Sequence, residues 1–310
     1  MSLVVVGSVA LDSVETPFGA AEDALGGTAS YFTTAASLFT RVQVVGVIGE
    51  DFPPPYLAYL QSRDADLSGV ATLPGKSFCW KARFDYNLST AQTLDTQLGV
   101  FAGFRPELPP SYRDAEFVFL GNIDPDLQLT VLEQLRRPRF VLLDTMDYWI
   151  TSKREELGKV VRRVDGVRIN EGEIRQYTGT FSLRAAARKL MEEGPRVVIV
   201  TRGEYGALLF SQDDLFVAPA YLLEEVRDPT GAGDTFAGGL MGYLAREGKV
   251  DRLTLRRAML YGAVLSSFTV EDFSLGRLRE VTLADVAQRY DELVRTTHFD
   301  EAALMPAGKE

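Results

Sequence analysis

The sequence predicts an α/β protein in three layers, with a mostly parallel sheet between two layers of helices and a small antiparallel β lid. From residue 116 onward, short apolar runs alternate with segments of helical pattern, which is typical of parallel βαβ units. Residues 76–101 instead alternate apolar and polar side chains, as antiparallel strands with one solvated face do. The 310 residues, 46% of them hydrophobic, suit one domain over residues 1–310.

The individual elements follow from the apolar runs and their period. Short runs that are apolar throughout predict buried strands at 3–6, 117–120, 140–143 and 197–200, and mainly apolar runs predict two more at 42–47 and 166–169. Apolar residues at helical spacing predict helices at 28–39, 53–63, 126–135, 152–164, 183–191, 235–246, 253–268 and 283–294. We also expect an edge hairpin at 207–217, an irregular polar stretch at 11–23 and a loose tail at 302–310.

Composition narrows the classes of function. The net charge of -10 argues against binding of nucleic acid through a basic surface. The single cysteine, Cys79, lies in an apolar run, so we expect its small side chain to be buried. It can form no intramolecular disulfide, so we expect a reducing, cytoplasmic setting for the protein. With one histidine, His298, a histidine metal site and a Ser-His-Asp triad are both disfavoured, so a general base should be a carboxylate. No apolar run reaches the roughly 18 residues of a membrane span, and a strand beginning at residue 3 predicts that no signal peptide precedes it.

The most informative stretch is the glycine loop, residues 227–239, which runs straight into a predicted helix. Gly231 and Gly233 remove side-chain bulk where a backbone must approach a ligand closely. The free N–H groups and partial positive charge of a helix start attract phosphate oxygens. Asp234 is a poor phosphate ligand there, but it is well placed to take a proton from a group that attacks the phosphate. A plain turn is the alternative, and the compact Gly-Ala-Gly-Asp sequence before a helix makes it the weaker one.

Polar residues follow several predicted strands at the carboxyl ends, where open α/β sheets bind ligands. About half of them should be helix caps or turn residues. They are Asp12, Asp51, Asn122, Asp124, Asp144, Asn170, Thr201 and Asp228. Asn170 and Glu173 lie one helical turn apart, a spacing that suits Mg²⁺ held by a carboxylate, waters and substrate phosphates. A helix start with acidic residues is the alternative interpretation. The sequence contains no P-loop, and Phe236 stands where a dinucleotide-binding loop has its third glycine.

Four segments, in matching order and spacing, resemble the ribokinase-like (PfkB) family of sugar and nucleoside kinases. Residues 228–234, Asp-Pro-Thr-Gly-Ala-Gly-Asp, fit the C-terminal signature of that family throughout. Gly26-Gly27 resembles its N-terminal signature, and Asn170-x-x-Glu173 resembles its Mg/phosphate motif. Thr201-Arg202-Gly203, followed by Gly206, resembles the segment that lines the ATP site.

The resemblance implies the ribokinase-like fold, an ATP- and Mg²⁺-dependent kinase activity, and roles for the matching residues. Asp234 would deprotonate the acceptor hydroxyl, and the amides of residues 231–233 (Gly231, Ala232, Gly233) would form an anion hole for the transferring phosphoryl group. Asn170 and Glu173 would position Mg²⁺ and phosphate. Thr201 and Gly203 would contact the nucleotide.

The resemblance also implies an acceptor site, a cation site and a lid. Asp12, Gly26 and Gly27 would hold the acceptor's hydroxyls, and the strand-end residue Asn122 is a further candidate contact. Asp228 and Thr230 match positions where members bind a monovalent cation such as K⁺. The lid would comprise residues of about 12–24 and 76–101, and such lids often form a homodimer interface.

One position departs from the family pattern, because Tyr31 stands where the N-terminal signature commonly has asparagine. An aromatic ring there can stack on a nucleobase or a sugar face, or pack in the core. We therefore expect a kinase for a hydroxymethyl group of a sugar or a sugar-containing small molecule. A nucleoside kinase is the nearest alternative, and a non-catalytic sugar-binding regulatory protein is the alternative from another class. As an exposed carboxylate near its ordinary pKa, Asp234 would be ionised at neutral pH.

Overall fold

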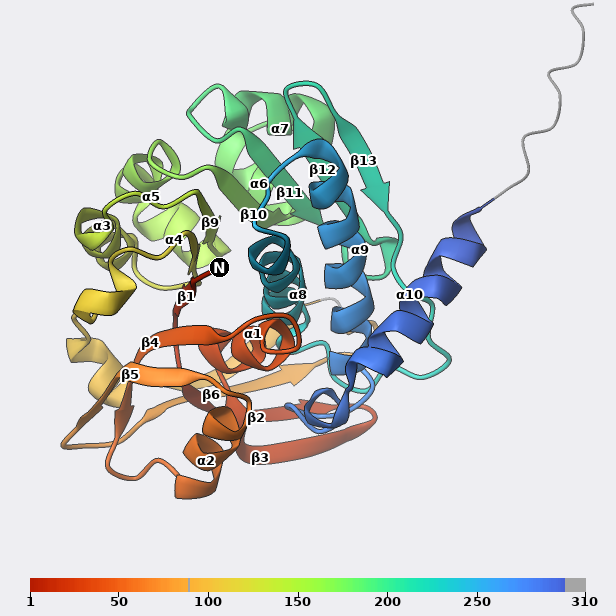
Figure 1. Cartoon of the computed structure of the whole chain (residues 1–310). Helices are drawn as coiled ribbons and strands as arrows, with labels where there is room; N and C mark the ends of the chain where they lie inside the picture. The colour runs from red at the N-terminus through yellow and green to blue at the C-terminus, as the bar shows by residue number, and fades with distance from the viewer. Residues whose placement is uncertain (89, 299–310) are drawn as a thin grey trace, which may run out of the picture.

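The computed structural model of the chain describes residues 1–88 and 90–298, and its centre is a sheet of nine strands (Figure 1). In spatial order these are β13 (Leu215–Ala218), β12 (Ala207–Ser211), β11 (Val197–Thr201), β10 (Gly166–Asn170), β9 (Phe140–Asp144), β8 (Phe117–Leu120), β1 (Leu3–Val6), β4 (Val42–Gly49) and β5 (Asp66–Leu73). Neighbouring strands from β11 to β5 are parallel, whereas β12 and β13 pair antiparallel at one edge. The mostly parallel sheet and its edge hairpin are thus confirmed.

Helices cover both faces of this sheet, which gives the predicted three layers (Figure 1). One face carries α1 (Thr28–Ala36), α2 (Pro54–Ser62), α8 (Ala232–Glu247), α9 (Arg252–Thr269) and α10 (Leu283–Thr297). The other carries α3 (Pro125–Gln134), α4 (Asp147–Ser152), α5 (Arg154–Val161), α6 (Glu171–Thr178) and α7 (Leu183–Met191). The sequence of β1 is continuously apolar because this strand is covered on both faces of the sheet. Leu3 and Val5 pack on the first face, and Val4 and Val6 pack on the second.

A second, smaller sheet has the order β3-β2-β6-β7 and corresponds to the predicted lid. Its strands are β2 (Ala10–Thr16), β3 (Gly19–Gly26), β6 (Phe78–Phe84) and β7 (Ala91–Gln97). β2 with β3 and β6 with β7 form antiparallel hairpins, and β2 pairs parallel with β6 between them.

The irregular stretch expected at residues 11–23 is wrong, because β2 and most of β3 lie there. The alternation is hidden in the sequence because two polar residues, Asp12 and Thr16, are on the buried side of β2. Edge strand β5 was not predicted either. The helix expected at 152–164 is α5, and the preceding helix α4 was not predicted; Lys153, whose φ of -136° is not helical, separates the two. The Lys153 ammonium lies 2.8 Å from Asp124 and 2.5 Å from Asp126, which fixes this break.

The small sheet is closed onto the main body in this structure. The Thr16 hydroxyl donates to the carbonyl of Arg227, the first residue of the glycine loop, at 2.8 Å. From the other side, the Ser274 hydroxyl donates to the carbonyl of Leu25 at 2.6 Å. The first bond joins the small sheet to the loop itself, and the second joins it to the segment that follows α9, so the position of the small sheet is linked to that of the loop.

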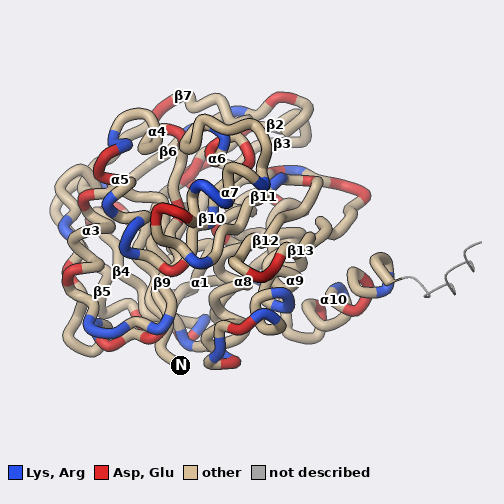
Figure 2. Tube along the Cα trace, turned by 90° about the horizontal axis from the view of Figure 1, so that it is seen from above, with Lys and Arg blue, Asp and Glu red and all other residues tan. Residues whose placement is uncertain are grey.

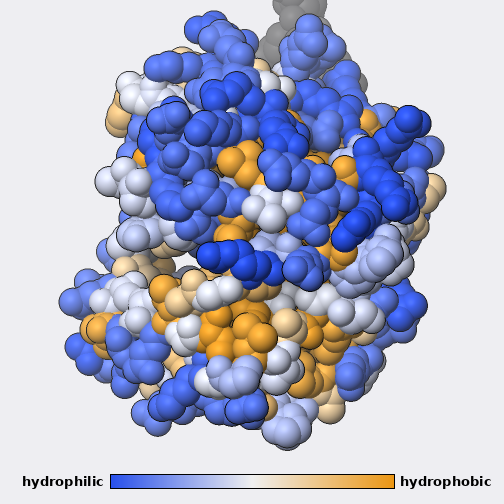
Figure 3. Space-filling model, turned by 90° about the vertical axis from the view of Figure 1, so that its left-hand side faces the viewer, coloured by the Kyte–Doolittle hydropathy of each residue, from blue (hydrophilic) through white to orange (hydrophobic). Residues whose placement is uncertain are grey.

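The surface agrees with an acidic protein of mixed charge. Figure 2 shows Lys and Arg interspersed with Asp and Glu along the chain. On the face seen in Figure 3, apolar side chains gather in the lower part, where the small sheet and β5 lie. Exposed apolar residues of these elements include Leu73 and Leu94.

Cys79 is half-buried rather than buried. Within residues 1–88 and 90–298, no helix is long and apolar enough to cross a membrane. The tail expected at 302–310 lies outside the described residues.

Candidate active site

The glycine loop and the first turn of α8 form the centre of the site. The helix begins at Ala232, three residues before the predicted start, and its N-cap is Gly231 with a φ of 75°. The Ala232 N–H donates to the carbonyl of Pro229 at 3.2 Å, so one of the three predicted anion-hole amides is engaged within the loop. In the described part of the chain, the N–H groups of Gly231 and Gly233 have no such acceptor. They are therefore available to an anion at the helix N-terminus.

Each glycine of the loop lies directly against a side chain from another element. A Cβ atom on Gly231 would lie 2.4 Å from the ring of Tyr31, and one on Gly233 would lie 1.8 Å from Nη2 of Arg168. Side chains of the protein therefore leave no room for a Cβ atom at either glycine, whether or not a ligand lies close to the loop. Of the two interpretations for Tyr31, the structure has core packing: its side chain is 1% exposed and supports the loop from α1. A contact of Tyr31 with the acceptor stays a prediction.

Asp234 lies in the first turn of α8 and is partly buried. Burial raises the pKa of its carboxyl group to about 7, and the negative charge of Asp144 adds to the increase. The Arg168 guanidinium and the Thr28 hydroxyl act in the opposite direction. The expectation of an exposed carboxylate with an ordinary pKa is therefore wrong, because tertiary packing surrounds Asp234 in a way that the local sequence does not show.

Asp12 reaches the same site from β2 of the small sheet and is only 6% exposed. Its Oδ2 accepts the N–H of Gly27 at 3.2 Å, and a Cβ on Gly26 would lie 2.0 Å from that oxygen. Burial raises the pKa of Asp12 to about 7, and the charges of Asp234 and Asp228 contribute. The effect of these two carboxylates on Asp12 indicates that the closed small sheet brings Asp12 near the glycine loop.

Asp228 is the second residue of the glycine loop and is 1% exposed. Its Oδ1 accepts the N–H of Thr230 at 2.9 Å, while the preceding Arg227 N–H donates to the carbonyl of Val270 at 2.8 Å. Burial raises the pKa of the Asp228 carboxyl group. The role of Asp228 and Thr230 in holding a monovalent cation stays a prediction.

Asn170 and Glu173 form a reciprocal capping box at the start of α6. The Glu173 N–H donates to Asn170 Oδ1 at 2.8 Å, and the Asn170 N–H donates to Glu173 Oε2 at 2.9 Å. Burial raises the pKa of Glu173 to about 7. Among residues 1–88 and 90–298 there is no group of three or more His, Cys, Asp or Glu side chains placed to hold a metal ion. One carboxylate at the sheet edge fits Mg²⁺ that takes its other ligands from water and phosphate.

The remaining candidates lie beyond neighbouring strand ends. Thr201 ends β11, and Gly203 follows it with a φ of 55° and open space on the side where a Cβ would project. Asn122 follows β8 and accepts the indole N–H of Trp149 at 3.0 Å, so its amide is fixed toward α4. As expected, some strand-end residues serve as caps: Asp124 caps α3 and Asn170 caps α6.

Arg168 was not predicted as a site residue, although it lies at the centre of the cluster. It comes from β10, and its Nη1 donates to Asp144 Oδ1 of neighbouring β9 at 2.6 Å. Both side chains are buried, with 13% of Arg168 and 3% of Asp144 exposed. The available signal was a charged residue within an otherwise apolar central strand, which proteins bury only with a partner or for function.

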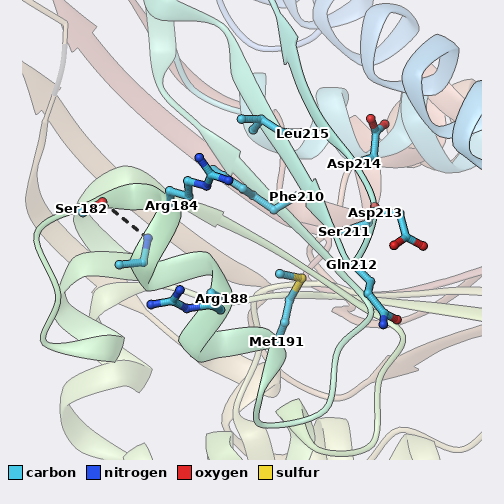
Figure 4. A pocket seen from close by; sticks show the side chains of 11 residues that line it. Ser182, Arg184, Arg188, Met191, Phe210, Ser211, Gln212, Asp213, Asp214 and Leu215 are labelled. Atoms are coloured by element: carbon cyan, nitrogen blue, oxygen red, sulfur yellow. Dashed lines mark hydrogen bonds between the residues drawn. The ribbon is translucent and has the colours of Figure 1, made fainter.

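A separate cavity of about 570 Å³ lies between α7 and the β12–β13 turn (Figure 4). Its lining includes Arg188, Gln212 and Asp213. The pairing of Ser211 with Val197 places this turn at the amino end of β11, whereas Thr201 lies at the carboxyl end. The cavity therefore lies at the amino ends of the parallel strands, whereas the glycine loop lies beyond their carboxyl ends, so the cavity is not part of the candidate site.

The fold and the loop define a class, namely α/β proteins that bind an anionic ligand at a helix N-terminus beyond the strands' carboxyl ends. Comparison with known proteins identifies the family. The pfkB family of carbohydrate kinases matches residues 3–280, so the chain belongs to that family. It is therefore a phosphotransferase that acts on a hydroxyl group of a sugar or nucleoside.

Individual relatives agree with this assignment. A cytidine kinase of Thermococcus kodakarensis is 35% identical over 83% of this chain and 95% of that protein. The fold matches a nucleoside kinase of Burkholderia thailandensis in complex with inosine, with a TM-score of 0.76, 21% identity and coverage of 94% and 98% of the two chains. It also matches an aminoimidazole riboside kinase of Salmonella enterica complexed with aminoimidazole riboside and an ATP analog, with a TM-score of 0.76, 20% identity and coverage of 94% and 100%.

Proposed function

We propose that this protein transfers the terminal phosphoryl group of ATP to the hydroxymethyl group of a ribonucleoside, with Mg²⁺ as cofactor. The observation that carries the proposal is the position of Asp234, in the first turn of α8 and within electrostatic reach of Asp12. One carboxylate can then take the proton of the reacting hydroxyl while the other holds the acceptor. A free sugar is the second candidate acceptor, favoured by the family's description as carbohydrate kinases.

The small sheet supports a nucleoside rather than a free sugar. Trp80 is the register partner of Asp12 in the β2–β6 pair, so both side chains leave the same face of the sheet. The Trp80 indole N–H donates to Thr93 at 3.3 Å, which fixes the orientation of the ring. An aromatic ring beside the sugar-binding carboxylate is suited to stack on a nucleobase. The relatives named for cytidine, inosine and aminoimidazole riboside act on or hold ligands with a base attached to ribose.

The chain's own groups would divide the reaction between them. Phosphoryl transfer depends on positioning and on charge stabilisation more than on covalent chemistry. Asp12 would accept hydrogen bonds from the ribose hydroxyls, and Asp234 would accept the proton of the attacking hydroxymethyl group. The amides of Gly231 and Gly233 would donate to the phosphoryl oxygens. When bound, Mg²⁺ neutralises phosphate charge, and Asn170 and Glu173 are the residues that would hold it together with its waters.

The pH dependence of turnover should report the raised pKa of Asp234. The base must be ionised to accept a proton, and the ionised fraction of a carboxyl group rises with pH. Because burial raises this pKa to about 7, kcat/KM should rise between pH 6 and 8, about tenfold per unit on the acid side. Asp12 and Glu173 titrate in the same range, so the midpoint belongs to the cluster. A profile that stays flat down to pH 5 would contradict the assignment.

Replacement of Glu173 by Gln should raise the Mg²⁺ concentration needed for half-maximal rate by about 10–100-fold. Gln can still accept the Asn170 N–H, so the helix cap is retained while the charge is lost. Mg²⁺ titrations at saturating ATP would measure the change. Glu171→Gln is the matched control, because Glu171 lies on the same helix as Glu173 and is paired with Arg175 and Arg202. An equal shift in both variants would count against a specific role for Glu173.

The function is tested by a screen with ATP and Mg²⁺ that pairs each nucleoside with its free sugar. We expect cytidine or another nucleoside to be phosphorylated with kcat/KM at least about tenfold above that for ribose. A preference for ribose or a hexose would replace the proposal with the sugar-kinase alternative. Binding of a sugar or nucleoside without turnover of any acceptor would favour the non-catalytic alternative. The homodimer through the lid, the K⁺ site and the cytoplasmic location stay predictions.

A further inference from the structure

We propose that Arg168 contacts the transferring phosphoryl group directly and acts as the side-chain cation of the transfer site. The inference rests on the proposed function, because it assigns a residue to the same site. Arg168 itself makes and breaks no bond. The bond from phosphorus to the ADP oxygen breaks, the bond to the acceptor oxygen forms, and the acceptor's proton moves to Asp234. The guanidinium donates hydrogen bonds to phosphoryl oxygens throughout.

The position of the guanidinium relative to α8 supports a direct contact. A Cβ on Gly233 would lie 1.8 Å from Nη2 and 2.7 Å from Cζ of Arg168. Cβ atoms of a helix point toward its N-terminus, so the guanidinium stands on the N-terminal side of the first turn. That is the side on which an anion meets the free N–H groups of the helix. A glycine at 233 is what allows the arginine to reach this place.

The donors of Arg168 are not used up by its partner. Asp144 accepts from Nη1 at 2.6 Å, and Nε is buried without any hydrogen-bond partner in the described part of the chain. A guanidinium carries five N–H donors, and buried donors without a partner are rare in folded proteins. Planar guanidinium groups match phosphate oxygens in geometry and charge. The pair with Asp144 therefore fixes the side chain and leaves donors for a ligand.

The charges of the site also require a cation at this point. Three carboxylates act on Arg168, namely Asp144, Asp234 and Glu173. Without the guanidinium, an incoming triphosphate would meet only negative side-chain charge from this cluster. In a water-poor site, a fixed positive group stabilises developing phosphoryl charge more strongly than it would in water.

Arg168→Met and Arg168→Lys test the inference through nucleotide binding and turnover. Calorimetry with Mg²⁺ would compare a non-hydrolysable ATP analogue with ADP, and steady-state kinetics would give kcat and the acceptor KM. We expect Arg168→Met to lower kcat by about 100–1,000-fold with the acceptor KM unchanged. Its preference for the ATP analogue over ADP should fall at least about tenfold. Arg168→Lys should recover part of both losses, since a charge without the planar fork remains.

The controls separate this role from a structural one. The double variant Asp144→Asn/Arg168→Met removes both members of the ion pair, so neither is left buried without the other, and it should fold while it shows the same losses. Arg196→Met removes an Arg–Asp pair at the amino edge of the same sheet and should leave turnover unchanged. A folded double variant with parental kcat, or equal losses of affinity for the analogue and ADP, would overturn the inference. If the unaltered protein binds neither nucleotide, the proposed function itself fails, and the inference with it.

Discussion

Asp234→Asn is expected to lower kcat by about 10²–10⁴-fold while the affinities for nucleotide and acceptor are retained. The amide has the size of the carboxylate, so it preserves the packing around the first turn of α8, but it cannot accept the proton of the attacking hydroxyl. Steady-state kinetics at pH 8, where the native carboxyl group is mostly ionised, would measure the loss. A variant with near-parental kcat would show that another group is the base.

The stability of the same variant provides an internal control. Burial raises the pKa of Asp234 to about 7, well above the value for an unfolded chain. Between these two pKa values the folded state binds more protons than the unfolded state, so this group's contribution makes the protein less stable as the pH rises through that window. Asp234→Asn should therefore unfold at higher denaturant concentration than the native protein at pH 8. Loss of both turnover and stability would mean that the substitution damages the fold.

The local sequence predicted that Asp234 is the base, but it did not predict the raised pKa of this carboxyl group. The order Gly-Ala-Gly-Asp before a helix placed a carboxylate beside free amides, which is information carried within a few residues. Its burial and the effect of Asp144 depend on β9, some ninety residues away in the chain. The spacing of apolar residues in the glycine loop and in β9 does not indicate how near the two carboxyl groups lie.

The fold shows the same division between local and distant information. Strands β1, β8 and β9 are buried on both faces, so their continuous apolar runs revealed them. β2 was missed because its inward residues Asp12 and Thr16 bind polar groups of other segments, which removes the apolar alternation that marks a strand. Arg168 is hidden for a similar reason, since its partners come from β9 and α8. Residues that build the site therefore break the patterns by which the scaffold is recognised.

Gly231→Ala should have the second large effect, because it damages both the loop's conformation and its packing. The left-handed φ of 75° costs a non-glycine residue about 1–3 kcal/mol. The new Cβ would lie 2.4 Å from the ring of Tyr31, which is 1% exposed and has no space to retreat, and such overpacking costs about 1–3 kcal/mol more. Urea unfolding would measure the sum. Displacement of the anion-hole amide by about 1 Å should also lower kcat by about 100-fold.

Gly179→Ala is the matched control for this prediction. Gly179 has a similar φ of 63° at the end of α6, and a Cβ there would meet no atom within 4 Å. The Gly179→Ala variant should therefore lose only the stability that the left-handed backbone conformation costs, and its kcat should stay at the parental value. If both variants lose equal stability, the ring of Tyr31 does not oppose a side chain at 231. The position of the loop would then be set by backbone conformation alone, and Tyr31 would be free of the supporting role that its burial beneath Gly231 indicates.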